Sequence, residues 1–132
     1  VNLEEQYFRG GVKTKNGQER IVPIHSGIYL IVKRRIERDG KLLSVSPSYF
    51  RKQMYNSFEK IGVERHTPHD CRDTFATLCD AAKVGKNYLK RLIGHSLAGD
   101  ITEDKYIHPS LEVLRSEIEK IDLSLIVTNE PD

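Results

Sequence analysis

The segment TPHDCRDTFATLCDAAKV, residues 67–84, places two anion-binding side chains at the start of a predicted helix. Thr67 and Pro68 are typical of a helix start, because a proline in the first turn costs no helical hydrogen bond. His69 and Arg72 follow, three residues apart and therefore on one side of the first turn. The first turn of a helix also has unpaired N–H groups and the positive end of the helix dipole. These features together predict a site for a phosphate group.

Apolar residues further along this helix predict how it packs. They form one stripe with the spacing i, i+3, i+4 and i+7, namely Phe75, Leu78, Cys79 and Ala82. A stripe of this kind faces the core of a soluble domain. We therefore expect the core to hold His69 and Arg72 in place through their own helix.

Three further side chains could act with these two on a phosphodiester bond: Lys15, His95 and Tyr106. A tyrosine hydroxyl can attack phosphorus and conserve the energy of the bond in a phosphotyrosine ester. An arginine binds non-bridging oxygens in a bidentate manner, and histidines donate or accept protons near neutral pH. A lysine ammonium can protonate the leaving 5′ oxygen. This chemistry requires no metal and no other cofactor, so we expect none.

A β-hairpin is predicted over residues 6–24 to carry Lys15. Two alternating, β-rich runs surround Gly10-Gly11 and Asn16-Gly17, which are typical turn residues. Lys13 lies two residues from Lys15 on the same strand face and is an alternative for the same role.

Helical patterns account for most of the remaining chain. Besides the helix that starts near His69, helices are predicted over residues 26–39, 46–62, 87–93, 100–108 and 109–121. Ser26 is the expected cap of the first of these, and Phe50, Met54 and Phe58 are expected core residues of the second. Gly94 is a natural C-terminal residue, which places His95 just beyond a helix end. The helix over 100–108 would hold Tyr106.

Composition is typical of one soluble domain. The chain has 132 residues, of which 38% are hydrophobic and 30% charged. No apolar run approaches a membrane span and no basic-then-apolar leader opens the chain, so we expect a cytoplasmic protein. Cys71 and Cys79 have neither a CxxC nor a Cys/His spacing, which argues against a disulfide or a metal site. We expect residues 1–121 to form the domain and residues 122–132 a tail.

Charge is distributed unevenly along the chain. Residues 1–108 hold 19 Lys and Arg against 13 Asp and Glu, a net +6, whereas residues 109–132 hold 2 against 6, a net −4. A basic body suits a polyanionic partner, although an ordinary solvated surface would give the same number.

Four boxes, in the same order, resemble motifs of the tyrosine recombinases, the phage integrase family. KTKNGQERIVPI is similar to the lysine-bearing hairpin, TPHDCRDTFAT to the His-x-x-Arg box, LIGHS to the Leu-Gly-His box and ITEDKYIHP to the tyrosine box. The resemblance covers residues 6–109. Four boxes in order are more specific than any one of them.

The resemblance implies a mainly α catalytic domain with a small antiparallel β-sheet. It implies that Tyr106 is the nucleophile, Arg72 the second arginine of the site, His69 and His95 the two histidines, and Lys15 the general acid. The implied product is a 3′-phosphotyrosyl link to double-stranded DNA. Other recombinase protomers would be partners in a tetrameric synapse, with the tail docking on a neighbour or folding back on its own domain. A bacterial or phage-encoded protein of a mobile element would be expected.

Two departures from the family pattern set further expectations. Nothing before Lys15 resembles the family's first arginine box, because Arg9 lies in the first strand and does not fit. We therefore expect a C-terminal fragment of a longer integrase, incomplete or weakly active on its own. Asp73 stands where the family often has another histidine, and it could either hold Arg72 or partly neutralise it.

Other interpretations are open for each residue. Taken alone, Tyr106 would be a core or rim aromatic, and Arg72 a surface ion-pair partner. His25 and His66 match no box and are expected to be helix-start hydrogen-bonding residues. The alternatives for the whole chain are a non-catalytic DNA-binding or protomer-docking module and a type IB topoisomerase-like strand transferase.

Overall fold

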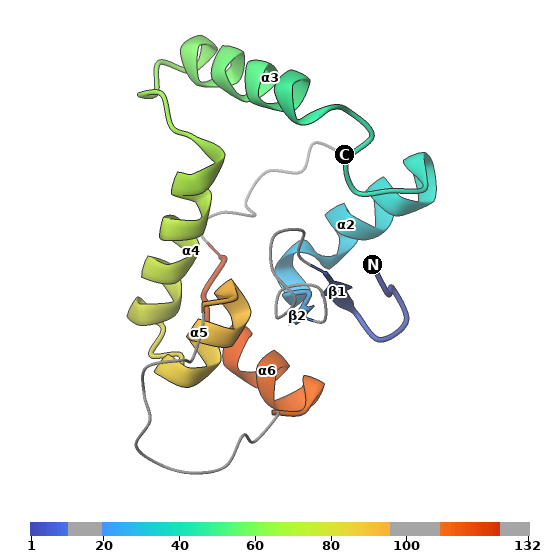
Figure 1. The fold of residues 1–132 in the computed structure, drawn as a ribbon, viewed down its shortest axis with the longest axis vertical. Coiled ribbons are helices and arrows are strands. Elements are labelled where there is room, and N and C mark those ends of the chain that lie inside the picture. The colour runs from blue at the N-terminus through green and yellow to red at the C-terminus, as the bar shows by residue number, and fades with distance from the viewer. Residues whose placement is uncertain (11–19, 96–108, 125–132) are drawn as a thin grey trace.

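Helices dominate the fold, with a two-stranded antiparallel sheet beside them (Figure 1). The computed structural model describes residues 1–10, 20–95 and 109–124. In chain order the elements are β1 (Tyr7–Arg9), β2 (Ile21–Pro23), α2 (Ser26–Asp39), α3 (Pro47–Lys60), α4 (Pro68–Ala81), α5 (Lys86–Ile93) and α6 (Leu111–Ile118). The predicted fold class, mainly α with a small antiparallel sheet, is confirmed.

Strands β1 and β2 are the paired ends of the predicted hairpin. Phe8 pairs with Val22 and Arg9 with Ile21. Beyond the last pair, the Gly10 backbone N–H donates to the Arg20 carbonyl at 3.0 Å, which extends the ladder by one bond. The predicted turn at Asn16-Gly17 lies outside the described residues.

The core lies where α4, α5 and α6 meet. Its buried members are Cys79, Val84, Leu92, Leu114, Ile118 and Ile121. The apolar stripe predicted on α4 is confirmed, since Cys79 is fully buried and the other three residues of the stripe pack against this cluster. Val22 of β2 packs on it as well, so the sheet and the three helices share one core.

The start of α2 differs from the prediction. The cap is His25, whose ring Nδ1 accepts from the Gly27 backbone N–H at 2.9 Å, whereas Ser26 is the first helical residue. The other ring nitrogen of His25 donates to the Ile121 carbonyl at 2.9 Å. A serine cap was therefore the wrong prediction, because the buried histidine makes both bonds at once and ties α2 to the end of α6.

Helix α3 is a second correction. Phe50, Met54 and Phe58 were predicted to be core residues, but α3 has no buried residue and Phe50 is 36% exposed. Figure 1 shows α3 at the end of the molecule away from α5 and α6. Its predicted start is confirmed, since the Ser46 hydroxyl accepts from the Tyr49 backbone N–H at 3.2 Å.

The C-terminal elements follow the prediction in part. α5 ends at Gly94, which has φ +70°, and His95 lies just beyond it. α6 is shorter than the predicted helix over 109–121, although Ile121 is still buried. Leu123, in the predicted tail, packs against the core of its own chain. The predicted helix over 100–108 and the end of the tail lie outside the described residues, and the division at residue 122 stays a prediction.

We predict that the two cysteines differ strongly in reactivity. Cys71 is exposed, whereas Cys79 is fully buried and burial raises the pKa of its thiol to about 11. The thiolate is the reactive species, so at pH 8 the Cys79 thiol should be both neutral and inaccessible. A colorimetric thiol reagent should modify Cys71 alone in the folded chain and both cysteines in denaturant. Rapid reaction in a folded Cys71→Ser variant would contradict the prediction.

Candidate active site

The first five residues of α4 include both members of the predicted His-x-x-Arg pair. His69 is exposed and Arg72 is partly buried. The Asp70 carboxylate accepts from the Thr67 backbone N–H at 2.7 Å, and this bond is the main reason that the pKa of Asp70 lies below its usual range. An ionised carboxylate thus lies at this helix start and offsets part of the helix dipole. Binding of a phosphate must therefore depend on the cationic side chains more than on the dipole.

The end of α5 positions His95. The backbone N–H groups of Gly94 and His95 donate to the Arg91 and Lys90 carbonyls at 3.1 and 2.9 Å. The left-handed conformation of Gly94 turns the chain out of the helix, and the His95 side chain is exposed beyond the turn. The predicted position of His95 outside a helix end is confirmed.

Arg20 joins the two helix ends and was not selected from the sequence. It directly precedes β2, and its guanidinium lies against Gly94, where an added Cβ would be 3.2 Å from the guanidinium carbon. Burial, and after it the positive charge of Arg72, lowers the pKa of Arg20. The side chain therefore lies against the end of α5, and its charge interacts with that of Arg72 on α4. The available signal was its presence in the KTKNGQERIVPI box, from which only the lysines were chosen.

Three of the five predicted site residues, Arg72, His69 and His95, are among the residues that the structure describes. The structure brings Arg72 and the Gly94–His95 turn together around Arg20, while His69 lies in the exposed first turn of α4. Lys15, its alternative Lys13, and Tyr106 lie outside the described residues. The five-residue site therefore stays a prediction.

Asp73 gives no support to either predicted role. Its side chain is exposed, and its backbone carbonyl accepts from the Thr77 hydroxyl at 2.9 Å. In the part of the chain that the structure describes, no ion pair joins Asp73 to Arg72.

The same part of the chain shows no cluster of His, Cys, Asp or Glu side chains able to bind a metal ion. Within it, too, no helix has the length and apolar character needed to cross a membrane.

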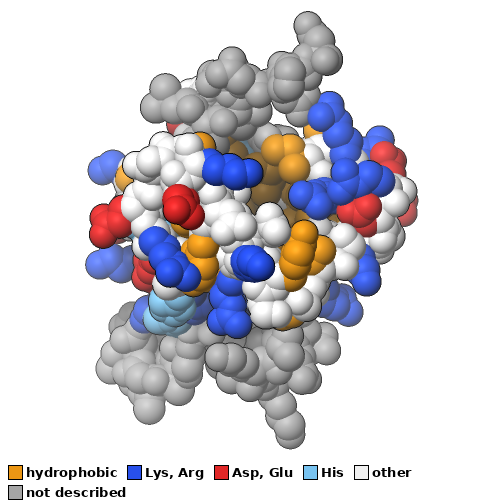
Figure 2. Space-filling model, turned by 90° about the horizontal axis from the view of Figure 1, so that it is seen from above, with side chains coloured by type: hydrophobic (Ala, Val, Ile, Leu, Met, Phe, Trp, Pro, Cys, Tyr) orange, Lys and Arg blue, Asp and Glu red, His pale blue; other side chains and the backbone are white. Residues whose placement is uncertain are grey.

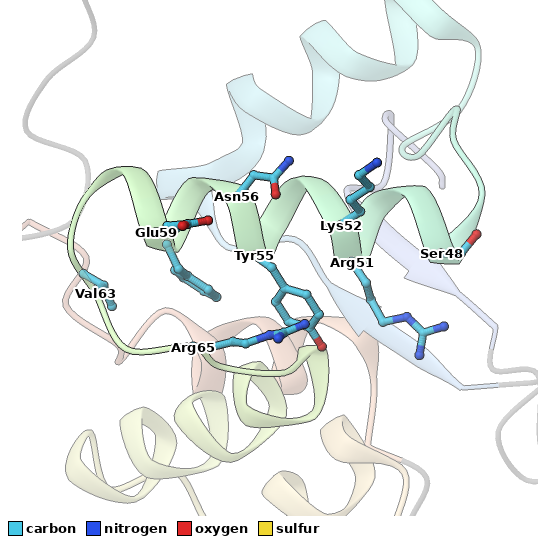
Figure 3. A pocket seen from close by; sticks show the side chains of 9 residues that line it. Ser48, Arg51, Lys52, Tyr55, Asn56, Glu59, Val63 and Arg65 are labelled. Carbon is cyan, nitrogen blue, oxygen red and sulfur yellow. The ribbon is translucent and has the colours of Figure 1, made fainter.

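A groove of about 740 Å³ runs along α3 and the loop that follows it (Figure 3). It is lined by Ser48, Arg51, Lys52, Tyr55, Asn56, Phe58, Glu59, Val63 and Arg65. The Arg65 guanidinium stacks on the Tyr55 ring at 3.7 Å from the ring centre. Figure 2, which views the molecule from the α3 end, shows Lys and Arg side chains spread over this face with apolar side chains between them.

Sequence reasoning missed this groove because it read only the apolar residues of α3. Ser48, Arg51, Lys52 and Tyr55 have the spacing i, i+3, i+4 and i+7, which places them on one face of the helix. That spacing was the signal for a basic and aromatic face.

The chain is 32% identical over 121 residues to "Tyrosine recombinase XerA" of Saccharolobus solfataricus, a match that covers 89% of this chain and 40% of the relative. It is 30% identical over 141 residues to "Tyrosine recombinase XerA" of Pyrococcus horikoshii, covering 93% of this chain and 46% of that relative. No family model matches the chain, and no solved structure does.

These matches, with the fold and the ordered boxes, support a likeness to part of a tyrosine recombinase over about 90% of this chain. The chain spans less than half of the length of these two relatives, 40% and 46%. The predicted resemblance is confirmed, and the roles of individual residues are proposals.

Proposed function

We propose that the chain contributes the catalytic residues of a site-specific DNA recombinase. The Tyr106 hydroxyl gives its proton to a histidine of the site and attacks a scissile phosphate, the bond from phosphorus to the 5′ oxygen breaks, and a 3′-phosphotyrosyl link forms. Lys15 gives its proton to the leaving 5′ oxygen. A 5′-hydroxyl of the partner strand then attacks the link, which releases Tyr106 and rejoins DNA. The reaction conserves the number of phosphodiester bonds and consumes no cofactor.

One observation carries the proposal most strongly: Arg72 at the start of α4 and the Gly94–His95 turn at the end of α5 converge on Arg20. A pentacoordinate phosphate in the transition state gains negative charge on its non-bridging oxygens, so cationic donors held in place lower its energy. The order of the boxes and the printed names of the two relatives agree with this chemistry.

The described residues have distinct roles in this proposal. Arg72 binds two non-bridging oxygens, because its guanidinium presents parallel N–H groups to them. His69 and His95 donate to the phosphate or exchange protons with it near neutral pH. Both histidines are exposed, so a DNA backbone can reach them without a change in the core.

The groove on α3 is the proposed DNA-contacting face. Arg51 and Lys52 are exposed on it and Arg65 is held over Tyr55, so several positive charges lie in one channel. Glu59 is the one acidic side chain among the groove residues. Positive side chains in such a channel displace the counterions of duplex DNA, and this release drives binding.

A non-catalytic DNA-binding or protomer-docking module is the second candidate. It is favoured by one observation, the groove along α3 that is lined by Arg51, Lys52 and Arg65, because binding of DNA there requires no catalytic residue. Nothing observed favours a type IB topoisomerase, and the two relatives are named as recombinases.

A tetrameric synapse, a cytoplasmic location and a bacterial or phage mobile-element source also belong to the proposal of a recombinase.

We predict that Tyr106→Phe abolishes covalent attachment to DNA while DNA affinity changes by less than about twofold, because only the attacking oxygen is lost. The natural chain that contains these residues would be incubated with a nicked suicide duplex from its own site and run on a denaturing gel. Tyr49→Phe is the matched control, since Tyr49 is 51% exposed on α3. An adduct of wild-type yield with Tyr106→Phe would remove Tyr106 from this role, and no adduct from a folded, DNA-binding wild-type chain would favour the second candidate.

We also predict that Arg51→Ala and Lys52→Ala weaken binding to duplex DNA of any sequence. The plot of log K against log salt concentration has a negative slope, and each substitution should make that slope less steep by about 0.9, because one phosphate contact is lost. Fluorescence anisotropy at several salt concentrations measures both effects. Arg38→Ala is the control, since Arg38 lies on α2 and pairs with Asp39 at 2.8 Å. An unchanged slope for both groove variants would contradict the proposed DNA face.

A further inference from the structure

The backbone of Arg20 is held in place by the sheet. Its carbonyl accepts from Gly10 at 3.0 Å, and the next residue, Ile21, pairs with Arg9. Val22, one residue further, packs against the core. The Cα position from which the Arg20 side chain extends is therefore fixed by the sheet and, through Val22, by the core.

The Arg20 guanidinium occupies the space that the absent side chain of Gly94 leaves free. A Cβ at residue 94 would lie 3.2 Å from the guanidinium carbon, 3.5 Å from Cδ, and would overlap Nη1. Gly94 has φ +70°, a backbone conformation that favours glycine, and the Arg20 side chain fills the space beside it. The turn that leads to His95 thus leaves room for a specific cation.

One nitrogen of this guanidinium lacks an acceptor among the described residues. Its Nε is buried and has no hydrogen-bond partner there. Arg115 offers a contrast: its Nε is also without a partner, but its Nη2 donates to the Glu5 carbonyl.

The charge that helps to lower the pKa of Arg20 has the same sign. Arg72 is a cation whose field acts on Arg20, and no ion pair in the described ranges connects either residue to a carboxylate. Two guanidiniums with partly buried donors are costly unless an anion binds between them. A tetrahedral phosphate has oxygens for both and an acceptor for the buried Nε.

We propose that Arg20 is a further phosphate-binding residue of this site, which binds oxygens of the same phosphate as Arg72. The inference deepens the proposed function and rests on it for the source of the phosphate, the DNA backbone. Arg20 touches the phosphate directly, and the glycine at residue 94 is what allows it to reach.

Binding of inorganic phosphate to this chain tests the inference directly. Proton–nitrogen spectra selective for arginine Nε–H groups would be recorded during a phosphate titration. The Arg20 and Arg72 signals should shift together, with one apparent Kd. Arg20→Gln should weaken phosphate binding about tenfold, as expected for the loss of a hydrogen bond to a charged group. Arg9→Gln is the matched control on the paired strand and should leave the affinity unchanged.

Two further results keep the test independent of folding. Arg20→Lys retains the charge and should bind phosphate with an affinity between those of the wild-type chain and Arg20→Gln. Circular dichroism shows whether each variant is folded. An Arg20 signal of the wild-type chain that does not respond to phosphate, or a folded Arg20→Gln with unchanged affinity, would overturn the inference.

Duplex DNA identifies the source of the phosphate. A short duplex should displace inorganic phosphate from Arg20 and Arg72, whereas binding of the duplex without displacement would overturn the assignment to DNA. Joint shifts of both signals in a chain that forms no covalent adduct would support the role of Arg20 and contradict the proposed reaction. The two proposals can therefore fail separately.

Discussion

The packing of α4, α5 and α6 around Cys79, Leu92 and Leu114 is the interaction on which the rest of the structure depends. A helix is rigid over a few turns, so burial of the far half of α4 also fixes its first turn, with His69 and Arg72. Burial of Leu92 fixes the end of α5 and the turn to His95 in the same way. Val22 brings β2, and with it Arg20, onto the same core. One apolar cluster thus sets the relative positions of four side chains, those of His69, Arg72, His95 and Arg20, which come from distant parts of the sequence.

The arrangement separates two tasks in the proposed recombinase. The ends of α4 and α5 and the start of β2 form a compact cationic site in which polar groups are partly buried, as binding of a single phosphate requires. Helix α3 has no buried residue and presents basic and aromatic side chains along a groove, as expected of a surface that follows a DNA backbone. The chain spans 40% and 46% of the length of its two relatives.

Local sequence patterns predicted where the helices and strands lie better than they predicted which residues of those elements are buried. The stripe on α4, the paired strands and the exit at Gly94 followed from periodicity and glycine chemistry, which act over a few residues. The apolar residues of α3 were wrongly predicted to be core residues, because periodicity identifies the apolar face of a helix but does not show whether another element covers that face. His25 caps α2 because its ring also reaches Ile121, 96 residues away, and no local rule contains that contact. The importance of Arg20 likewise depends on a glycine at residue 94 in another element.

The central claim is that the Arg72 guanidinium stabilises the negative charge of a scissile phosphate. It is tested most directly by the cleavage rate of Arg72→Ala on two duplexes that differ only at the scissile position, one with phosphate and one with a neutral methylphosphonate. Relative to wild type, the variant should lose about 10²–10³ in rate on phosphate and less than about tenfold on methylphosphonate, because the neutral group no longer requires a guanidinium. Equal losses on both duplexes would show that Arg72 acts otherwise and would contradict the account.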